Sequence, residues 1–293
     1  MTAGTVSDCA FTNNTCSWCA AAVVSGGVLE NCLFADNATS DSAGEGGAIR
    51  VTGTGFVRDC VVERCKAIYG SGMWVKGASA VVSNCVIRGC SLYAATSRGF
   101  GGAPLELCNG LAVNCVVTNN SGGAAGGVTT YNGYTGASGV APVLRNCLVA
   151  GNKASGYGSN ALGAGGIYHG CGTIENCTVA GNGVTGSCAV GGILGQVMSG
   201  TPVIRNTIAW GNSPVDADVA SGVTVATSSL GADPVFKTGR YELGGGSPFR
   251  DAGTWQDWMR NAVDLAGQPR VFAGAVDLGC YEFILSRTLL QLR

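Results

Sequence analysis

The chain is short of charge and of histidine, and these shortages remove several classes of function. Charged residues make up 12% of the 293 residues, and the formal net charge is −1. No basic stripe is present, so a nucleic-acid partner is not expected. No run of about 18 apolar residues occurs, so no transmembrane helix is predicted. The one histidine, His169, is expected to be a polar residue that points outward, and no Ser/His/Asp arrangement can be assigned from the sequence.

No secretory signal is visible in this sequence, because Met1 to Gly4 lead directly into the first of a series of repeats. The chain is therefore expected to be a mature portion or a fragment of a secreted protein. Helical repeats are excluded by composition. The chain contains 49 glycines, and no window keeps apolar residues at helical spacing without a glycine.

A repeat that recurs eight times organises the chain up to about residue 215. Each copy has an anchor residue, which is preceded by Asn or Asp and followed five positions later by Asn or Cys. The anchors are Cys9, Cys32, Cys60, Cys85, Cys115, Cys147, Cys177 and Thr207. The residues before them are Asp8, Asn31, Asp59, Asn84, Asn114, Asn146, Asn176 and Asn206. The residues five positions after them are Asn14, Asn37, Cys65, Cys90, Asn120, Asn152, Asn182 and Asn212. A period of this size predicts a solenoid.

Each copy shows the alternation of two short strands that meet at a corner. In the copy around Cys177, Ile174, Cys177 and Val179 are expected to point inward, and their neighbours outward. Asn176 is expected at the corner, because Asn and Asp tolerate a left-handed backbone. The second Asn column and glycine pairs such as Gly165-Gly166 mark further corners. The prediction is an all-β parallel β-helix of about eight rungs, spaced about 4.8 Å apart, with a cysteine ladder inside and an asparagine ladder at the corner.

The fifteen cysteines leave the thiol state open. A largely reduced stack inside the coil is one interpretation, because a free cysteine behaves as a small buried apolar residue. A disulfide between Cys65 and Cys90 is the second, because these residues share a column on adjacent rungs. A zinc site at Cys16 and Cys19 is the third, although no second pair follows at suitable spacing.

The Asn-Cys-x-Val-x-x-Asn and Gly-Gly-Ile units resemble those of right-handed, single-stranded parallel β-helix proteins of the pectate-lyase-like superfamily. They are also similar to Cys- and Gly-rich β-helix proteins of bacterial surfaces. The resemblance covers about residues 1–215 and implies the fold. It implies no single activity, because this fold hosts lyases, hydrolases, adhesins and inert spacers.

Residues 216–293 differ in composition and are expected to form a C-terminal cap. Strings resembling the C-terminal region of secreted bacterial proteins called choice-of-anchor Q domains occur in order: Ala232-Asp233-Pro234-Val235-Phe236, Tyr241-Glu242-Leu243, Ser247-Pro248, Asp251-Ala252-Gly253, Asp264-x-x-Gly267-x-x-Arg270 and Val276-Asp277-Leu278-Gly279-Cys280-Tyr281-Glu282. The resemblance implies an extracellular or cell-surface location in a bacterium. Asp251, Asp264 and Asp277 are candidate Ca²⁺ ligands, and the alternative is that they hold turns and pair with arginines. No other cofactor is expected.

Aromatic residues gather in the longer segments between the repeats, where insertions in a solenoid often form a binding face. The candidate ligand-binding residues are Tyr69, Trp74, Tyr93, Phe100, Tyr131, Tyr134 and Tyr157. They could stack on a polysaccharide or a cell-surface glycan, or they could simply cover the flank of the coil.

Three functions follow from these observations. The first is a non-catalytic scaffold, adhesin-like or glycan-binding module, which the scarcity of ionisable residues favours. The second is a polysaccharide lyase or glycoside hydrolase, which would need a cluster of acids and bases on one face. The third is a spacer that associates end to end. An alternating row of opposite charges that contains Arg145, Glu175 and Arg205 is expected to be structural.

Overall fold

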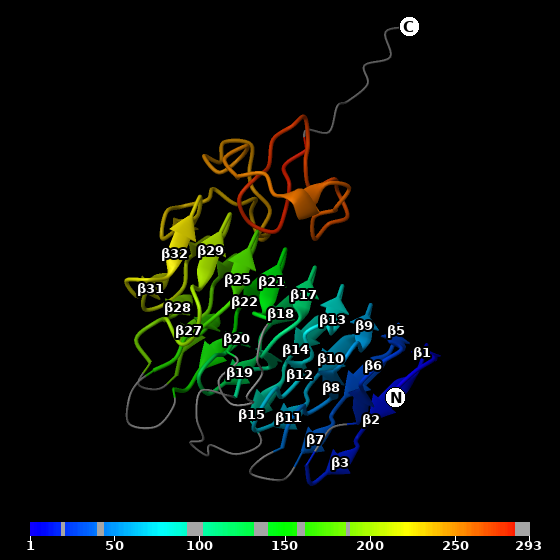
Figure 1. Ribbon diagram of the computed structural model, residues 1–293. Helices are drawn as coiled ribbons and strands as arrows, with labels where there is room; N and C mark the ends of the chain where they lie inside the picture. The colour runs from blue at the N-terminus through cyan, green and yellow to red at the C-terminus, as the bar shows by residue number, and fades with distance from the viewer. Residues whose placement is uncertain are drawn as a thin grey trace, which may run out of the picture.

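The computed structural model describes residues 1–18, 21–39, 44–92, 102–131, 140–156, 162–185 and 188–284. The chain winds as a right-handed parallel β-solenoid, and strands one lap apart lie side by side along its length (Figure 1). The predicted all-β parallel β-helix is therefore confirmed. In the described residues, no helix is long and apolar enough to cross a membrane.

Three long sheets and two short ones form the walls. The first long sheet contains β1 (Thr5–Ser7), β5 (Val28–Glu30), β9 (Phe56–Arg58), β13 (Val81–Ser83), β17 (Leu111–Val113), β21 (Val143–Arg145), β25 (Thr173–Glu175), β29 (Val203–Arg205) and β32 (Thr224–Ala226). The second contains β2 (Ala10–Thr12), β6 (Leu33–Ala35), β10 (Val61–Glu63), β14 (Val86–Arg88), β18 (Val116–Thr118), β22 (Leu148–Ala150), β26 (Thr178–Ala180), β30 (Ile208–Trp210) and β33 (Ser229–Leu230). The third contains β4 (Ala22–Val24), β8 (Ile49–Thr52), β12 (Met73–Lys76), β16 (Leu105–Leu107), β20 (Val128–Thr130), β24 (Ile167–His169), β28 (Ile193–Gly195) and β31 (Ala217–Val219).

The short sheets connect the second long sheet to the third. One contains β3 (Thr15–Cys16), β7 (Ala38–Thr39), β11 (Lys66–Ala67) and β15 (Ser91–Leu92). The other contains β19 (Ser121–Gly122), β23 (Lys153–Ala154) and β27 (Gly183–Val184). A single turn of 3₁₀ helix, Asp257–Met259, lies in the C-terminal region.

The corner between the first and second sheets is formed by the Asn/Asp residue before each anchor. All eight of these residues have φ between 47° and 55°. Asn and Asp adopt this left-handed conformation at lower cost than other residues with a β-carbon. A ninth lap repeats the corner with Thr227 and Ser228, and the φ of Thr227 is 45°. The strands of the second sheet therefore continue one lap beyond the last Asn-containing copy.

The Asn column five residues after each anchor turns into the interior instead of forming the second corner. The left-handed residue there is one position earlier, as at Asn119 (φ 54°) and Gly151 (φ 66°). Asn152 Nδ2 donates to Asn182 Oδ1 at 3.0 Å, and Asn152 Oδ1 accepts from Asn120 Nδ2 at 2.9 Å. These buried amides form a ladder between laps, because each one hydrogen-bonds with both of its neighbours.

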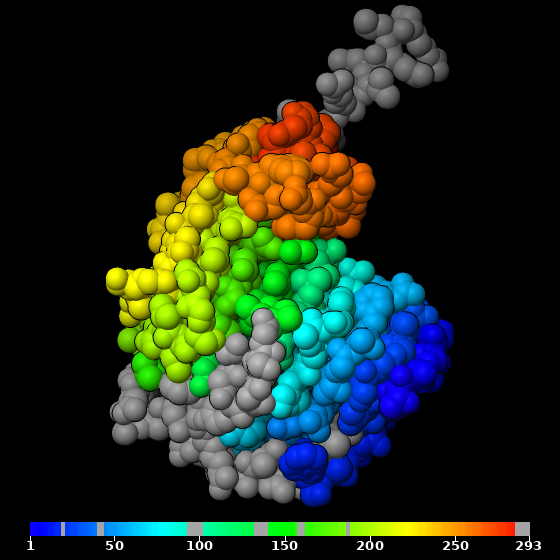
Figure 2. Space-filling model, viewed as in Figure 1, coloured from blue at the N-terminus to red at the C-terminus, as the bar shows by residue number. Residues whose placement is uncertain are grey.

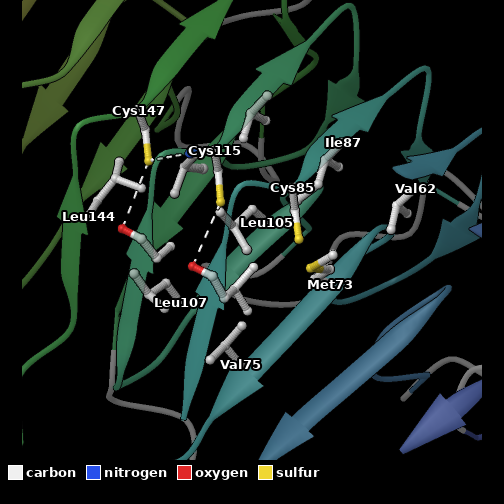
Figure 3. Packing of buried hydrophobic residues seen from close by; sticks show 14 of the residues in the cluster. Val62, Met73, Val75, Cys85, Ile87, Leu105, Leu107, Cys115, Leu144 and Cys147 are labelled. Atoms are coloured by element: carbon white, nitrogen blue, oxygen red, sulfur yellow. Dashed lines mark hydrogen bonds between the residues drawn. The ribbon is translucent and has the colours of Figure 1, made fainter. Parts of the chain in front are cut away.

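The anchor cysteines form the predicted column inside the solenoid. Cys115, Cys147 and Cys177 are each 0% exposed, and the Cys115 N–H donates to Cys147 Sγ at 3.3 Å. Figure 3 shows the thiols of Cys85, Cys115 and Cys147 among buried aliphatic side chains. The buried anchor thiols, and those of Cys65 and Cys90 in the next column, are free and form no disulfides. Cys19, which belonged to the zinc hypothesis, lies outside the described residues.

In two of the pairs, the second glycine is required because the chain passes close to an inward side chain. A β-carbon at Gly127 would lie 2.6 Å from Val149 Cγ1, and one at Gly166 would lie 2.7 Å from Val179 Cγ1. Real β-carbon contacts are longer than this, so a larger residue would force the rung apart. The pairs therefore set how tightly the third sheet packs against the second.

His169 points into the interior, so the expectation of an outward residue is wrong. It is 0% exposed, and its Nδ1 lies 2.7 Å from Thr130 Oγ1 on the neighbouring strand. It shares the inward column of Val51, Val75 and Leu107, because alternation along β24 places Tyr168, not His169, on the outer face. Burial lowers the pKa of His169 to about 4, so the ring is neutral at pH 7.

The C-terminal region, residues 231–284, packs against the outer side of the later rungs. Leu243 and Leu278 contact Ile208, which lies on the outer face of β30. The corner asparagines anchor the region, because Asn206 accepts from Thr254 N–H at 2.8 Å and donates to Thr254 O at 2.7 Å. Figure 2 shows this region, coloured orange to red, seated against the green and yellow part of the solenoid.

Candidate functional site

The predicted aromatic residues do not form an exposed row within the described part of the chain. Trp74 is only 2% exposed, so its ring is covered in this structure, and its role as a ligand contact stays a prediction. Tyr69 and Tyr131 are half-buried. Tyr93, Phe100, Tyr134 and Tyr157 lie outside the described residues, and their role stays a prediction.

Trp74 belongs to a cluster of rings and charges on the outer face of the third sheet. The Arg50 guanidinium lies between two indoles, 5.3 Å from the ring centre of Trp18 and 4.9 Å from that of Trp74. Arg50 also pairs with Glu45 at 3.3 Å. Cation–π contacts of this kind stabilise a protein surface when the cation is partly desolvated. The cluster therefore satisfies its own charges, as expected for residues that cover the flank of the coil.

Glu106 is the one residue of this cluster with acid chemistry suited to neutral pH. Burial raises its pKa to about 7, although the Gly70 N–H donates to its Oε2 at 3.2 Å. The carboxylate of Glu45 adds to the rise by repulsion. A carboxyl with this pKa could donate a proton as a general acid. Glu106 is only 3% exposed, however, so its carboxyl is separated from solvent.

The charge row on the first sheet pairs as expected between laps. Arg145 approaches Glu175 at 2.7 Å, and Arg205 approaches the same carboxylate at 3.8 Å. The C-terminal region covers the row, because Trp258 stacks on Arg145 with 4.4 Å between the guanidinium and the ring centre. Glu175 is 4% exposed. The row joins rungs together and does not converge on an open site.

Two of the three aspartates proposed as Ca²⁺ ligands, Asp264 and Asp277, use their carboxylates to hold turns in the C-terminal region. Asp264 Oδ1 accepts from the N–H groups of Ala266 at 2.9 Å and Gln268 at 2.7 Å. Asp277 Oδ1 accepts from Asp251 N–H at 2.6 Å. Ca²⁺ needs six to eight converging oxygens, whereas the oxygens of Asp264 and Asp277 already accept backbone amides. Among the described residues, no group of three His, Cys, Asp or Glu side chains could hold a metal ion. Two of the three carboxylates are therefore used within turns, and binding of Ca²⁺ by these residues stays a prediction.

A buried arginine fixes these turns to the solenoid. Arg270 is 0% exposed and pairs with Glu282 at 3.1 Å. It also donates to Asp277 O at 2.7 Å and to Asn146 Oδ1 at 3.3 Å, so it reaches the corner asparagine of the sixth copy. A buried charge is tolerated only when its donors are met, and this network meets most of them. The C-terminal region is thus held rigidly where it faces the solenoid.

Residues of the C-terminal region form an open hollow of about 340 Å³. Its lining consists of Trp255, Met259, Arg260, Asn261, Ala262, Pro269 and Val271. Trp255 is 43% exposed, so much of its ring is open to solvent. This volume is at the lower end of the range for small-ligand sites, which combine apolar and aromatic walls with a few polar groups.

Arg260 distinguishes this hollow from the rest of the surface. Every other arginine in the described ranges uses its guanidinium in an ion pair, a hydrogen bond or a ring contact, and Arg260 uses its guanidinium in none. Asn261, next to it, is exposed and left-handed, with φ 64°. A free guanidinium beside an exposed indole can bind an anionic or hydroxyl-rich ring.

Sequence reasoning missed this site. The available signal was the pair of tryptophans, Trp255 and Trp258, in a chain with only five. Spacing alone could not show that Trp258 covers Arg145 while Trp255 stays exposed. A second hollow, of about 310 Å³, lies at the second corner and includes Lys153 and Asn119, but its lining residues contain no aromatic ring.

Comparison with known proteins supports the architecture and adds no activity. A family model described as a right-handed beta helix region matches residues 2–140, so this part of the chain is similar to that family. Neither a search of curated proteins nor a search of solved structures found a significant match.

Proposed function

We propose that this chain is a non-catalytic extracellular β-solenoid that binds a polysaccharide of the bacterial cell surface or its surroundings. The hollow around Trp255 and Arg260 is its proposed contact with the sugar. The observation that carries the proposal is the half-exposed indole beside an arginine that has no partner of its own. The indole face would stack on the apolar face of a sugar ring, and the guanidinium would bind a carboxylate or hydroxyl group.

The rigidity of the region supports this role. Binding is stronger when the contacting groups are already held in place, because less conformational entropy is lost. Met259 is 1% exposed and fixes the floor of the hollow, and Arg270 fixes the turn beside it. The solenoid then serves as the scaffold that presents the site. The C-terminal strings that resemble those of secreted bacterial proteins support the extracellular location.

The test is titration of the full chain with acidic and neutral oligosaccharides, measured by calorimetry and by tryptophan fluorescence. Trp255→Ala and Arg260→Gln are each expected to weaken binding at least about tenfold, the loss typical of a central aromatic or arginine contact. Arg240→Gln is the matched control, because Arg240 is an exposed arginine of the same region that already pairs with Glu242. Unchanged affinity in both hollow variants would refute the assignment of the site.

A polysaccharide lyase or glycoside hydrolase is the second candidate, and Glu106 is the observation that favours it. Burial raises the pKa of Glu106 to about 7, and the Glu45 carboxylate lies near it, so two acidic groups share one part of the surface. The low exposure of Glu106 weighs against substrate access. Assays for unsaturated uronates and for new reducing ends decide the matter. Product release by the native chain that Glu106→Gln abolishes would replace the scaffold proposal with an enzyme.

A further inference from the structure

The solenoid presents sheet edges at both of its ends, and at the first end Met1 pairs with one of them, because its ammonium group donates to Val23 O at 2.7 Å and its carbonyl accepts from the Ser25 N–H at 2.8 Å. Strands β1, β2 and β4 are the outermost members of the three long sheets at one end, and β32, β33 and β31 are outermost at the other. Figure 1 shows β1 and β32 at opposite ends of the rod. An edge strand carries unpaired N–H and C=O groups that can pair with another chain. All neighbouring strands here are parallel, so both ends expose edges of the same polarity.

The last rung also exposes side chains that belong to the interior. Val225 continues the inward column of Ile204, which is 0% exposed, yet Val225 itself is 42% exposed. Leu230 continues the column of Ala209, and Val219 that of Gly195. Both are partly buried hydrophobic residues packed on the core. The end face is therefore an apolar surface that the C-terminal region leaves uncovered.

The first rung carries matching side chains in the same columns. Val6 pairs with Leu29 and so belongs to the column that ends in Val225. Phe11 stacks on Phe34, with ring centres 4.6 Å apart and planes 6° apart. The column of Phe11 ends in Leu230. A first rung placed one lap beyond the last would thus meet apolar residues in its own register.

The hydrogen bonds of the anchor column continue in the same sense. The N–H of Cys177 donates to Thr207 Oγ1 at 3.4 Å, and the N–H of Thr207 donates to Ser228 Oγ at 3.1 Å. A thiol can take the acceptor role, because the Cys9 N–H donates to Cys32 Sγ at 3.4 Å. In a stacked pair, the N–H of Ser228 in one copy would donate to the exposed Cys9 thiol of the next.

We propose that the last rung is a docking surface for the first rung of a second copy of this chain. The first and last rungs carry apolar side chains in the same columns, and their edge strands run in the same direction. Both features favour a contact in which the last rung of one copy meets the first rung of the next. Such a heterologous contact leaves a free rung at each end of the pair, so it propagates into an open filament. The C-terminal region lies on the side of the rod and travels with each copy, which would repeat the Trp255 hollow along the filament.

The experiment combines sedimentation velocity of the full chain over a wide concentration range with alkylation of Cys9, mapped by peptide mass spectrometry. The native chain is expected to form species larger than a monomer and to protect Cys9 as they form. Val225→Lys places a charge on the end face, and we expect it to abolish these species and restore Cys9 labelling. Val263→Lys is the matched control, because Val263 is 43% exposed on the C-terminal region, and it should assemble like the native chain.

Each other outcome overturns the proposal. A native chain that stays monomeric throughout has no such surface. Assembly that survives Val225→Lys but protects Cys9 joins two first rungs. Assembly that Val225→Lys abolishes while Cys9 remains reactive joins two last rungs. Thermal unfolding of the variants, which should match that of the native chain, separates loss of docking from loss of folding.

Discussion

Asn152 gives the sharpest test of the inner amide ladder. Its side chain is 0% exposed and makes four hydrogen bonds. Nδ2 donates to Val117 O at 2.9 Å and to Asn182 Oδ1 at 3.0 Å. Oδ1 accepts from the backbone N–H of Asn120 at 3.0 Å and from its Nδ2 at 2.9 Å. Replacement by alanine removes all four and leaves buried donors without acceptors.

Each such bond contributes about 0.5–1.5 kcal/mol net, so Asn152→Ala should lower the free energy of unfolding by about 4 kcal/mol. Asn152→Cys is the matched variant, because Cys90 and Cys65 occupy this column two and three laps earlier, respectively. A thiol accepts weakly, as Cys65 Sγ does from Asn37 Nδ2 at 3.8 Å, so about half of the loss should remain. Ser121→Ala, at an exposed position on the adjacent lap, is the neutral control.

Urea unfolding followed by circular dichroism measures these differences in the free energy of unfolding. The variants should show the same slope of that free energy against urea concentration as the native chain. A loss below about 1 kcal/mol for Asn152→Ala would refute the reasoning, because it would match an ordinary surface substitution. So would an equal loss for Asn152→Cys and Asn152→Ala, because the thiol would then contribute nothing as an acceptor.

Three further predictions concern a buried base, a corner and a buried charge. The pKa of His169 in the folded protein is about 4, below its ordinary value of 6.5, so the free energy of unfolding should fall by about 3 kcal/mol as the pH drops from 6.5 to 4. In urea titrations at several pH values, His169→Gln should remove most of this dependence on pH. Asn84→Ala, at φ 51°, should lower stability by about 1–2 kcal/mol, whereas Asn84→Gly should change it much less, which thermal melts will show. Glu175→Gln should lower the free energy of unfolding by about 1.5–3 kcal/mol, because the partly buried Arg145 and Arg205 lose the carboxylate that lies between them. An equal loss for the more exposed Glu30→Gln would contradict this cause.

The solenoid could be predicted because its determinants are local and periodic. An Asn or Asp before each anchor marks a corner by its backbone preference alone, and alternation then sets which neighbours point inward. The ninth lap was missed because Thr227 and Ser228 replace the Asn–Cys signal there. Thr227 adopts the same left-handed backbone conformation at a higher energetic cost, and the packing of the surrounding lap holds it in that conformation.

The candidate site could not be predicted because side-chain direction there depends on packing between distant segments. His169 lies in a strand that follows a corner of variable length, and a shift of one residue exchanges the inner and outer faces. Trp74 lies on the outer face, but it is covered there and packs beside Arg50. The exposure of Trp255 depends on how the C-terminal region folds against the corner asparagines, Asn146 and Asn206. No local pattern encodes such contacts.

The stacking of successive laps around buried amides is the claim on which the fold, the presentation of the hollow and the end-to-end contact all depend. Scalar coupling across a hydrogen bond tests it directly by nuclear magnetic resonance. A long-range correlation is expected between the backbone ¹⁵N of Asn120 and the side-chain ¹³Cγ of Asn152, because the N–H and the oxygen are joined at 3.0 Å. Absence of this correlation, together with rapid solvent exchange of the Asn120 amide, would contradict the account.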